Sequence, residues 1–477
     1  MVISEGDNIN LRLDRDSLYL IFSHLPFLDK IRAQRVCKVW KHLLENLVSV
    51  QPIITIKGNL WKSICDDTDH VHRREDNLAR IFQKDDISKV IIQHDILIDI
   101  LRRCSNVKVV QLIDVTIEGD ETLATIAQLC PGIECLNLFF VETVDKSTTL
   151  DTGLRWIAWA SNSRLKHLYL KAMNKKFGEN TLRDVFRMCP NLQIVNVENS
   201  IITLSDSSLC HLTSNMTKFS GAFCAADPFD QDGHNQFIQG FQESGLLAIC
   251  QGFGQHLSEL RLSSISDAVL YNICKNLLNL KCLELFWEDQ DPVPHNCYQI
   301  SSLRNLQRLT LRVKNENVDF FDEDVLQIMK SCPKLKTLVL SVPLGDSSMQ
   351  HIATFCPNIE QLGLMFAKNP KLVSDKSFKA FAALRNLRVL DVWDSAVTDE
   401  ACIALIKACP KLTFLSLRSC HEISNSSFYA YLKKAHNQQN LKMKFCHYQT
   451  RIVLRPHDLK IIPDNLKVKG IHKAPFW

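Results

Sequence analysis

Long apolar runs are missing from this sequence. Nowhere among its 477 residues do about 18 apolar residues follow one another, so we expect no membrane-spanning helix. The first ten residues are polar and acidic, unlike the basic and then apolar start of a secretory signal. We therefore expect an intracellular protein, located in the cytoplasm, the nucleus or both.

Motifs that carry catalysis are also missing. The sequence has no His-Glu-x-x-His, no Gly-x-Ser-x-Gly and no Walker loop, and Gly252-x-Gly254 lacks the third glycine of a dinucleotide-binding turn. His70 and His72 lie in a charged stretch without further ligands at metal-site spacing, which favours a solvated loop. We therefore expect a protein that is not an enzyme and that holds neither a cofactor nor a metal.

Neither the cysteines nor the charges point to a special class of partner. The 18 cysteines include no Cys-x-x-Cys pair, which argues against a zinc module and favours reduced, buried thiols. The net charge is +4, and only residues 451–473 form a mildly basic stretch. Because no block of Lys and Arg dominates, we do not expect nucleic acid to be a partner.

One phrase, Cys-Pro-x-Leu-x-x-Leu-x-Leu, recurs along most of the chain at intervals of about 26 residues, within the range of repeat proteins. Complete copies begin at Cys130, Cys189, Cys332, Cys356 and Cys409, and variants without Cys-Pro lie between them. The leucines alternate as on a strand that buries one face. The Cys is expected to be a small buried residue, and the Pro after it stops the preceding helix.

A helical pattern separates successive phrases. Segments such as TDEACIALIKAC after Val397 open with an acidic residue, which suits a helix N-terminus, and continue with apolar residues on one face. Each repeat is thus predicted to be one strand plus one helix, which cannot bury its apolar side alone and must stack on its neighbours. The fold class is α/β, and the expected architecture is a solenoid. An acidic, proline-containing loop is predicted over residues 287–296.

The repeats resemble the cysteine-containing leucine-rich repeats of F-box proteins, which implies a horseshoe-shaped solenoid. The resemblance covers roughly residues 52–447, with about a dozen or more repeats and an irregular insertion near 219–254. Flanking these repeats, we expect a flexible N-terminus over residues 1–10, a small all-helical segment over 11–50 and a C-terminal tail over 448–477.

The N-terminal segment carries its own signature. Leu18, Ile21, Phe22 and Leu25 form a helical stripe that Pro26 ends, and two further short helices are compatible with residues 31–43. About forty residues rarely make an independent core, so such a segment needs a covering partner. The segment resembles an F-box, although Leu13-Asp14 stands where that family usually has Leu-Pro. The motif positions, which the resemblance assigns to binding of a Skp-type adaptor, are Leu13, Leu18, Ile21, Phe22, Leu25, Pro26, Leu28, Ile31, Val36, Cys37 and Trp40.

The resemblance implies a substrate-recognition subunit of an SCF-type ubiquitin ligase, in which the adaptor links the chain to a cullin and a RING protein. A protein substrate is expected on the strand-lined, concave side, where aromatic and Arg side chains serve as anchors. Trp393 and Phe286 are favoured, because large aromatics exposed on a strand face need a reason. The full set of candidates is Phe139, Tyr169, Phe286, Arg312, Met365, Trp393 and Arg418.

Two other interpretations stay open. The repeats can serve as a protein-interaction scaffold that works without the adaptor, and the Leu13-Asp14 departure leaves room for that. A receptor that senses a small molecule on its concave side is a weaker alternative, because Arg261, Arg308 and Arg312 are too sparse for the basic cluster it needs.

Overall fold

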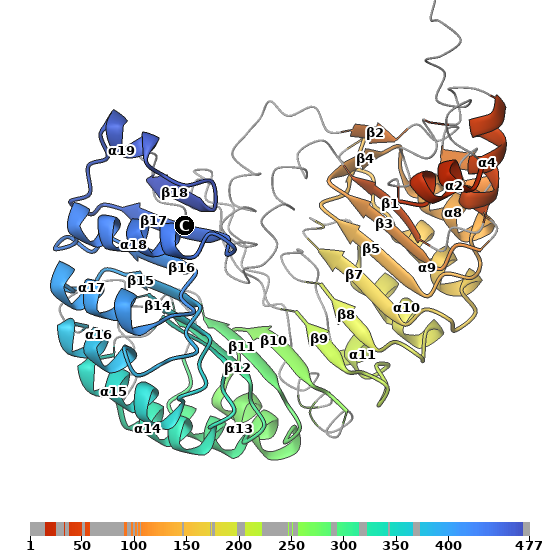
Figure 1. Ribbon diagram of the computed structural model, residues 1–477. Helices are drawn as coiled ribbons and strands as arrows, with labels where there is room; N and C mark the ends of the chain where they lie inside the picture. Colours follow the sequence, from red (N-terminus) through yellow and green to blue (C-terminus); the bar gives the residue numbers. More distant parts are fainter. Residues whose placement is uncertain are drawn as a thin grey trace, which may run out of the picture. The chain divides into compact units, whose positions relative to one another are not determined.

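The structure is a computed structural model (Figure 1). It describes residues 15–24, 33, 38–49, 53–57, 90–92, 97–98, 101–102, 104, 106–145, 147–171, 173, 177–197, 206–221, 247, 250, 256–287, 293–313, 322–341, 344–365 and 373–470. The chain divides into two compact units, of which the first runs to Met216 and the second starts at Thr217, apart from residues 227–245, which group with the first. Among the described residues, no helix is both long and apolar enough to cross a membrane.

The first unit begins with two helices and continues as strand-helix repeats. The helices are α2 (Arg15–Ser23) and α4 (Lys38–Ser49). A parallel sheet follows in the order β1 (Ile53–Lys57), β3 (Val109–Ile113), β5 (Cys135–Phe139), β7 (His167–Lys171) and β8 (Ile194–Asn196). Along the chain, α8 (Asp120–Leu129), α9 (Asp151–Ala160) and α10 (Glu179–Met188) connect successive strands, and the short α11 (Asp206–Leu209) follows β8. A small second sheet holds β2 (Val90–Ile92), β4 (Val115–Ile117) and β6 (Glu142–Thr143).

The second unit repeats the same plan more regularly. Its parallel strands are β9 (Lys218–Ser220), β10 (Glu259–Ser263), β11 (Cys282–Trp287), β12 (Arg308–Val313), β13 (Thr337–Ser341), β14 (Gln361–Met365), β15 (Val389–Trp393), β16 (Phe414–Arg418), β17 (Met443–Tyr448) and β18 (Leu466–Gly470). The helical elements are α13 (Asp267–Asn276), the 3-10 helix η3 (Cys297–Ser302), α14 (Asp322–Ser331), α15 (Asp346–Phe355), α16 (Asp375–Phe381), α17 (Asp399–Ala408), α18 (Asn425–Asn437) and α19 (Pro456–Lys460). Within this unit the strands line the inner side of a curve and the helices the outer side (Figure 1).

The predicted α/β solenoid with one strand and one helix per repeat is confirmed. Alternate strand residues such as Leu415 and Leu417 of β16 are fully buried, and so are Cys402 and Leu405 on the inner face of α17. Strands pair in register with those of the next repeat, so that equivalent residues form rows across the sheet. The leucine spacing therefore encodes both the strand and the side of it that faces the core.

The recurrent cysteine binds backbone at the end of a neighbouring helix. The thiol of Cys409 lies 3.6 Å from the carbonyl oxygen of Phe381 and 3.7 Å from that of Leu384. Cys332 and Cys356 make equivalent contacts with the repeats before them. A helix end leaves carbonyls without partners inside the helix, and a small weak donor can reach them in this buried turn. This supports the structural interpretation of the cysteines.

In several repeats the aspartate that opens a helix also caps the next helix. The carboxylate of Asp399 accepts hydrogen bonds from the backbone N–H and the hydroxyl of both Ser424 and Ser427, at the start of α18. Burial alone would raise the pKa of Asp399, but these hydrogen bonds outweigh it and hold the pKa below its usual range. Equivalent capping hydrogen bonds are accepted by the carboxylates of Asp120, Asp151, Asp346 and Asp375. The sequence predicted a role for these residues only in their own helix.

Replacing Asp399 by Ala is expected to lower the free energy of unfolding by about 2–4 kcal/mol, because four donors lose a charged acceptor. Glu400→Ala, in the same first turn of α17, is the control and should change it by no more than about 0.5 kcal/mol. Since the pKa of Asp399 is lowered on folding, its contribution is present above the ordinary aspartate pKa and is lost as the pH falls through the folded value. Urea unfolding at pH 7 and at a pH well below the ordinary aspartate pKa of about 4 measures this. An equal cost at both pH values contradicts the assignment.

The repeats extend beyond residue 447, where the sequence placed the start of a tail. Strand β18 pairs with β17 along its whole length, and α19 lies between the two strands in sequence. The side-chain amide of Asn465 donates to the carbonyls of Ala435, Gln438 and Leu441 and so caps the end of α18. This last repeat, which ends with β18, has no Cys-Pro phrase, which explains why the sequence pattern missed it. Residues 1–10 and most of the predicted insertion at 219–254 lie outside the described residues.

Candidate functional site

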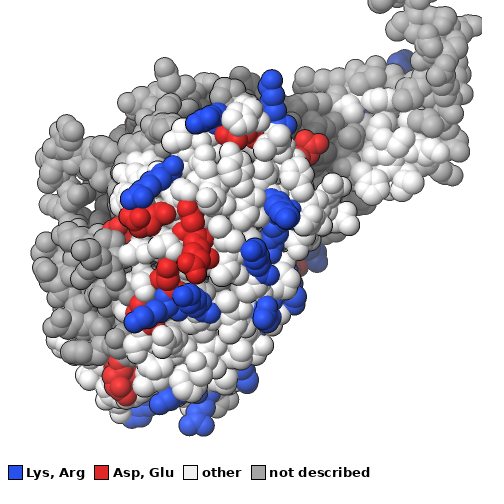
Figure 2. Space-filling model, turned by 60° about the vertical axis from the view of Figure 1, so that its left-hand side comes forward, with Lys and Arg blue, Asp and Glu red and all other residues white. Residues whose placement is uncertain are grey.

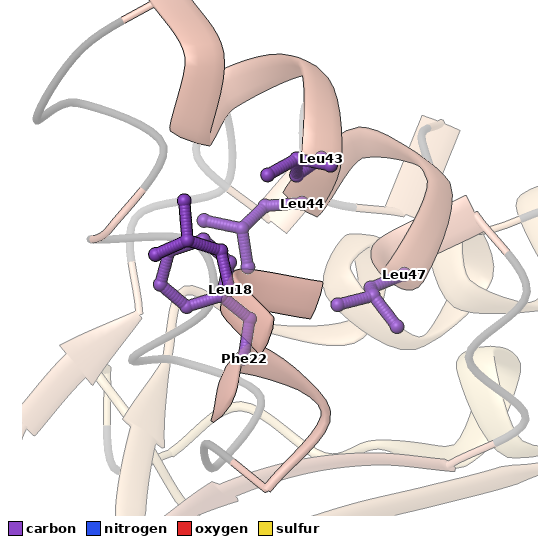
Figure 3. Packing of buried hydrophobic residues seen from close by; sticks show 5 residues of the cluster. All are labelled: Leu18, Phe22, Leu43, Leu44 and Leu47. Atoms are coloured by element: carbon purple, nitrogen blue, oxygen red, sulfur yellow. The ribbon is translucent and has the colours of Figure 1, made fainter. Parts of the chain in front are cut away.

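The N-terminal helices form a small core of their own. Leu18 and Phe22 of α2 pack against Leu43, Leu44 and Leu47 of α4, and all five side chains are buried (Figure 3). Trp40 packs against this cluster edge-on, with its ring centroid 4.7 Å from that of Phe22. A core of this size gives only a few kcal/mol of stability, so it orients α2 and α4 without closing the segment off from partners.

The other face of α2 exposes three consecutive large apolar side chains. Tyr19, Leu20 and Ile21 are 43%, 62% and 48% exposed. The helix ends at Ser23, two residues after Ile21, and the Ser23 hydroxyl donates to the carbonyl of Leu20 at 2.6 Å, so the backbone is held while the side chains point outward. Contiguous exposed apolar side chains are uncommon on a protein surface and indicate an interaction site.

The structure divides the predicted adaptor-binding residues into two groups. Leu18, Phe22 and Trp40 belong to the helical core, whereas Ile21 lies on the exposed face. Tyr19 and Leu20 share that face and were missed by sequence reasoning. The signal was the unbroken run Leu-Tyr-Leu-Ile-Phe, because one side of a helix cannot bury five consecutive residues. Side chains of the remaining motif residues lie outside the described part of the chain: Leu13, Leu25, Pro26, Leu28, Ile31, Val36 and Cys37.

The strand face of the second unit carries two aromatic-arginine pairs, each formed across neighbouring strands. Phe286 of β11 is in register with Arg312 of β12, and the guanidinium carbon lies 5.7 Å from the ring centroid. Trp393 of β15 is likewise in register with Arg418 of β16, at 4.4 Å. These are cation-π distances. The repeated register of the solenoid therefore brings residues about 25 positions apart into the same arrangement twice.

The predicted exposure of Phe286 is wrong, because this side chain is only 7% exposed. The neighbouring strand brings Arg312 over its ring, which covers a surface that the sequence alone leaves open. Trp393 is half-buried, and its indole N–H donates to the carboxylate of Asp391 at 2.9 Å. Of the two aromatics, Trp393 therefore offers more surface to a partner. The side chain of Met365 lies outside the described residues.

In the first unit the two aromatic candidates lie on adjacent strands. Phe139 is the last residue of β5, and Tyr169 is at the centre of β7, opposite Asn137 of β5. Both side chains are half-buried. They occupy the alternate positions that face away from the buried leucines, as the strand periodicity predicted.

A buried charge cluster lies on the same face of the second unit. Glu284 of β11 is 4% exposed, with its carboxylate 3.2 Å from the guanidinium of Arg261 and 3.8 Å from that of Arg308. The two arginines balance a buried carboxylate, which would otherwise be costly to desolvate. Figure 2 draws another face, which brings forward the helices at the left of Figure 1, and on it Lys and Arg lie around a band of Asp and Glu.

The buried thiols are not set up for nucleophilic chemistry. Burial raises the pKa of Cys282, Cys332 and Cys356 to about 12, so these thiols are protonated at neutral pH. Within the described ranges, no group of three or more His, Cys, Asp or Glu side chains is arranged to hold a metal ion. What the described residues do offer is binding surface, at α2 and along the strands.

Comparison with known proteins adds an assignment for the N-terminal helices. The F-box domain model matches residues 10–50, which contain α2 and α4. A curated relative, the BTB/POZ domain-containing protein FBL11 of Arabidopsis thaliana, is 32% identical over 108 residues. That match covers 22% of this chain and only 11% of the length of the relative.

Similar solved structures span most of the chain at low identity. A chain from the yeast Rad7 and Elc1 complex is 17% identical, with a TM-score of 0.49 over 93% of this chain and 97% of that one. A leucine-rich-repeat protein of Leptospira interrogans is 16% identical, with a TM-score of 0.38 over 80% and 81%. An internalin of Listeria monocytogenes is 15% identical, with a TM-score of 0.35 over 75% and 89%. The solenoid assignment itself rests on the strand-helix repeats described above.

Proposed function

We propose that this chain, in which an F-box precedes leucine-rich repeats, is the substrate-recognition component of an SCF-type E3 ubiquitin ligase. Its F-box binds a Skp-type adaptor, which connects it to a cullin and a RING protein inside the cell. The observation that carries the proposal is the exposed face of α2, formed by Tyr19, Leu20 and Ile21 within the segment that the F-box model matches.

The size of this face fits a docking site. Burying one such side chain fully contributes about 1.5–3 kcal/mol, so three partly exposed ones supply several kcal/mol toward the cost of association. Leu18 and Phe22 hold the helix from behind, so the exposed residues are presented on a supported element. A preorganised apolar face loses less entropy on binding than a segment that must first fold.

The proposed mechanism is proximity. The chain contributes no reacting group, but it holds a substrate near a ubiquitin-charged enzyme that the other end of the assembly recruits. Binding at both ends turns a bimolecular encounter into an effectively intramolecular one, which raises the local concentration of substrate lysines. Tightly stacked repeats suit this role, because a flexible arm would dilute that concentration.

A protein substrate is proposed to bind the strand-lined face. Support comes from Trp393 and Arg418, because Trp and Arg are enriched among the residues that dominate binding energy at interfaces. The ring of Trp393 is fixed by Arg418 on one side and by the hydrogen bond to Asp391, so little side-chain entropy remains to be lost on binding. Phe139 and Tyr169 are the corresponding candidates in the first unit.

Co-expression with a tagged Skp-type adaptor tests the proposal. The expected result is a stable one-to-one complex that stays together on size-exclusion chromatography and also recruits the cullin. If the folded, monodisperse chain captures no adaptor, the ligase assignment is wrong, and a scaffold that uses the same repeats without ubiquitin transfer takes its place.

A further inference from the structure

Helix α9 exposes two tryptophans on the helical side of the first unit. Trp156 is 46% exposed and Trp159 is 67% exposed, while Leu154, Ile157 and Ala158 form the buried face of the helix. The two rings contact each other edge to face, with centroids 5.4 Å apart and planes at 87°. Exposed as they are, these rings contribute little to the core, so the stability of the repeat does not explain them.

Corresponding helices fill these two positions with other residue types. Trp156 and Trp159 are the sixth and ninth residues of a ten-residue helix that begins with Asp. In α8, α10, α13, α14, α15 and α17 the sixth residue is Thr125, Asp184, Asn272, Gln327, His351 or Ala404. The ninth residue in the same helices is Gln128, Arg187, Lys275, Lys330, Thr354 or Lys407. Two tryptophans at these solvent-facing positions therefore set α9 apart from the repeat pattern.

The charges beside this pair are mainly positive. Helix α10 packs next to α9, and three arginines gather around the single carboxylate of Asp184: Arg155 at 3.1 Å, Arg187 at 3.6 Å and Arg183 at 3.9 Å. The other acidic residues of α8, α9 and α10 lie in the first turns of these helices, as Asp120, Glu121, Asp151 and Glu179 do. Beyond the first turns of α9 and α10, three arginines therefore stand against one carboxylate, which leaves a surplus of positive charge on these two helices.

We propose that Trp156, Trp159 and the arginines of α9 and α10 form a second protein-binding surface, which takes an acidic segment with an apolar anchor side chain. The tryptophans supply the contact area that buries the anchor, and the arginines attract the carboxylates around it. Trp and Arg are the residue types most enriched among binding hot spots. This surface lies on the helical side of the repeats, so it is separate from the strand face, and its residues belong to α9 and α10 and not to α2.

Selection from a random-peptide phage library tests the proposal on the full-length chain. Peptides are retained on the wild type after depletion on the variant Trp156→Ser, Trp159→Ser. The expected peptides combine several Asp or Glu residues with an aromatic or aliphatic anchor. If no peptide depends on the two tryptophans, or if the selected peptides are basic or uncharged, the proposal is overturned.

Matched variants then separate the two parts of the surface. Binding of a fluorescein-labelled copy of the selected peptide is measured for two double variants. One carries Trp156→Ser with Trp159→Ser, the other Arg183→Glu with Arg187→Glu, and each is expected to bind about tenfold or more weakly than the wild type. The control is a double variant with Tyr271→Ser and Lys407→Glu, which changes an exposed aromatic and an exposed cation on other helices. It should bind the peptide like the wild type. Binding should also weaken as salt is raised. Unchanged affinity in the tryptophan or arginine variant contradicts the proposal.

Self-association is the competing outcome. If light scattering finds a dimer of the wild type that the tryptophan variant cannot form, the surface binds a second copy of this chain and the acidic-segment proposal fails. Variants at Leu20 and Ile21 are expected to leave peptide binding unchanged, so failure of this proposal and failure of the proposed adaptor binding are distinguishable.

Discussion

Replacing Leu20 and Ile21 together by Lys is expected to abolish capture of the Skp-type adaptor. Both side chains belong to the exposed face of α2, so the change removes two apolar contacts and brings two ammonium groups to a surface that binding would dehydrate. Losing about 3 kcal/mol or more corresponds to a dissociation constant raised by at least about 100-fold. Calorimetric titration of the purified variant with the adaptor measures this.

The control pair is Val453→Lys with Ile461→Lys, because these two aliphatic side chains are similarly exposed and lie outside the F-box segment. Lysine is chosen because a cation near the C-terminal end of a helix does not oppose the helix dipole, so loss of binding cannot come from unwinding α2. Both pairs should keep the circular dichroism of the wild type. Wild-type affinity in the folded α2 variant would remove this face from the adaptor interface.

Replacing Trp287 by Ala is expected to lower the free energy of unfolding of the second unit by about 3–5 kcal/mol. The indole is 2% exposed at the end of β11, and its N–H donates to the backbone carbonyl of Ile265 at 3.1 Å. Truncation leaves a large void and a carbonyl without its partner, and both are costly in a buried site. Guanidinium unfolding measures the midpoint, and hydrogen exchange of β10 to β12 locates the damage.

Two further substitutions separate packing from hydrogen bonding. Trp287→Phe keeps much of the ring volume but not the bond to Ile265, so we expect an intermediate loss. Trp393→Ala removes a half-buried ring from the strand face and should cost clearly less than Trp287→Ala. Equal costs for Trp287→Ala and Trp393→Ala would contradict the assignment of Trp287 to the core.

The repeat architecture could be predicted because its signal is redundant. The same leucine and cysteine positions recur many times, and each recurrence reports the same two facts, which residues form a strand and which side is buried. Leu415, Leu417 and Cys409 are buried as the phrase predicts. The end of the solenoid escaped prediction because β18 is followed by no further phrase and is recognised only by its pairing with β17.

Exposure on the strand face could not be predicted, because it depends on residues of the next repeat. Phe286 and Trp393 hold equivalent strand positions, and each has an arginine in register on the next strand, yet only Phe286 is fully covered. For Trp287, the sequence failed to predict burial. It precedes an acidic, proline-containing stretch and was therefore assigned to a loop, whereas the strand continues through it and its ring turns into the core.

The F-box segment was recognised from its motif, but its two faces could not be separated from sequence. The helical stripe groups Leu18, Ile21 and Phe22, and only the packing of α4 against α2 decides that Leu18 and Phe22 are covered and Ile21 is not. Tyr19 and Leu20 fall off the stripe and were passed over for that reason. In a helix that binds a partner opposite its core, a second apolar face is the informative feature.

Hydrogen exchange of the full-length chain, with and without a saturating Skp-type adaptor, tests the central claim most directly. The account predicts that the adaptor slows exchange in α2 and α4, residues 15–23 and 38–49, and leaves the strands and helices of the second unit unchanged. Protection confined to the repeats, or no protection anywhere in a folded and monodisperse sample, would contradict it.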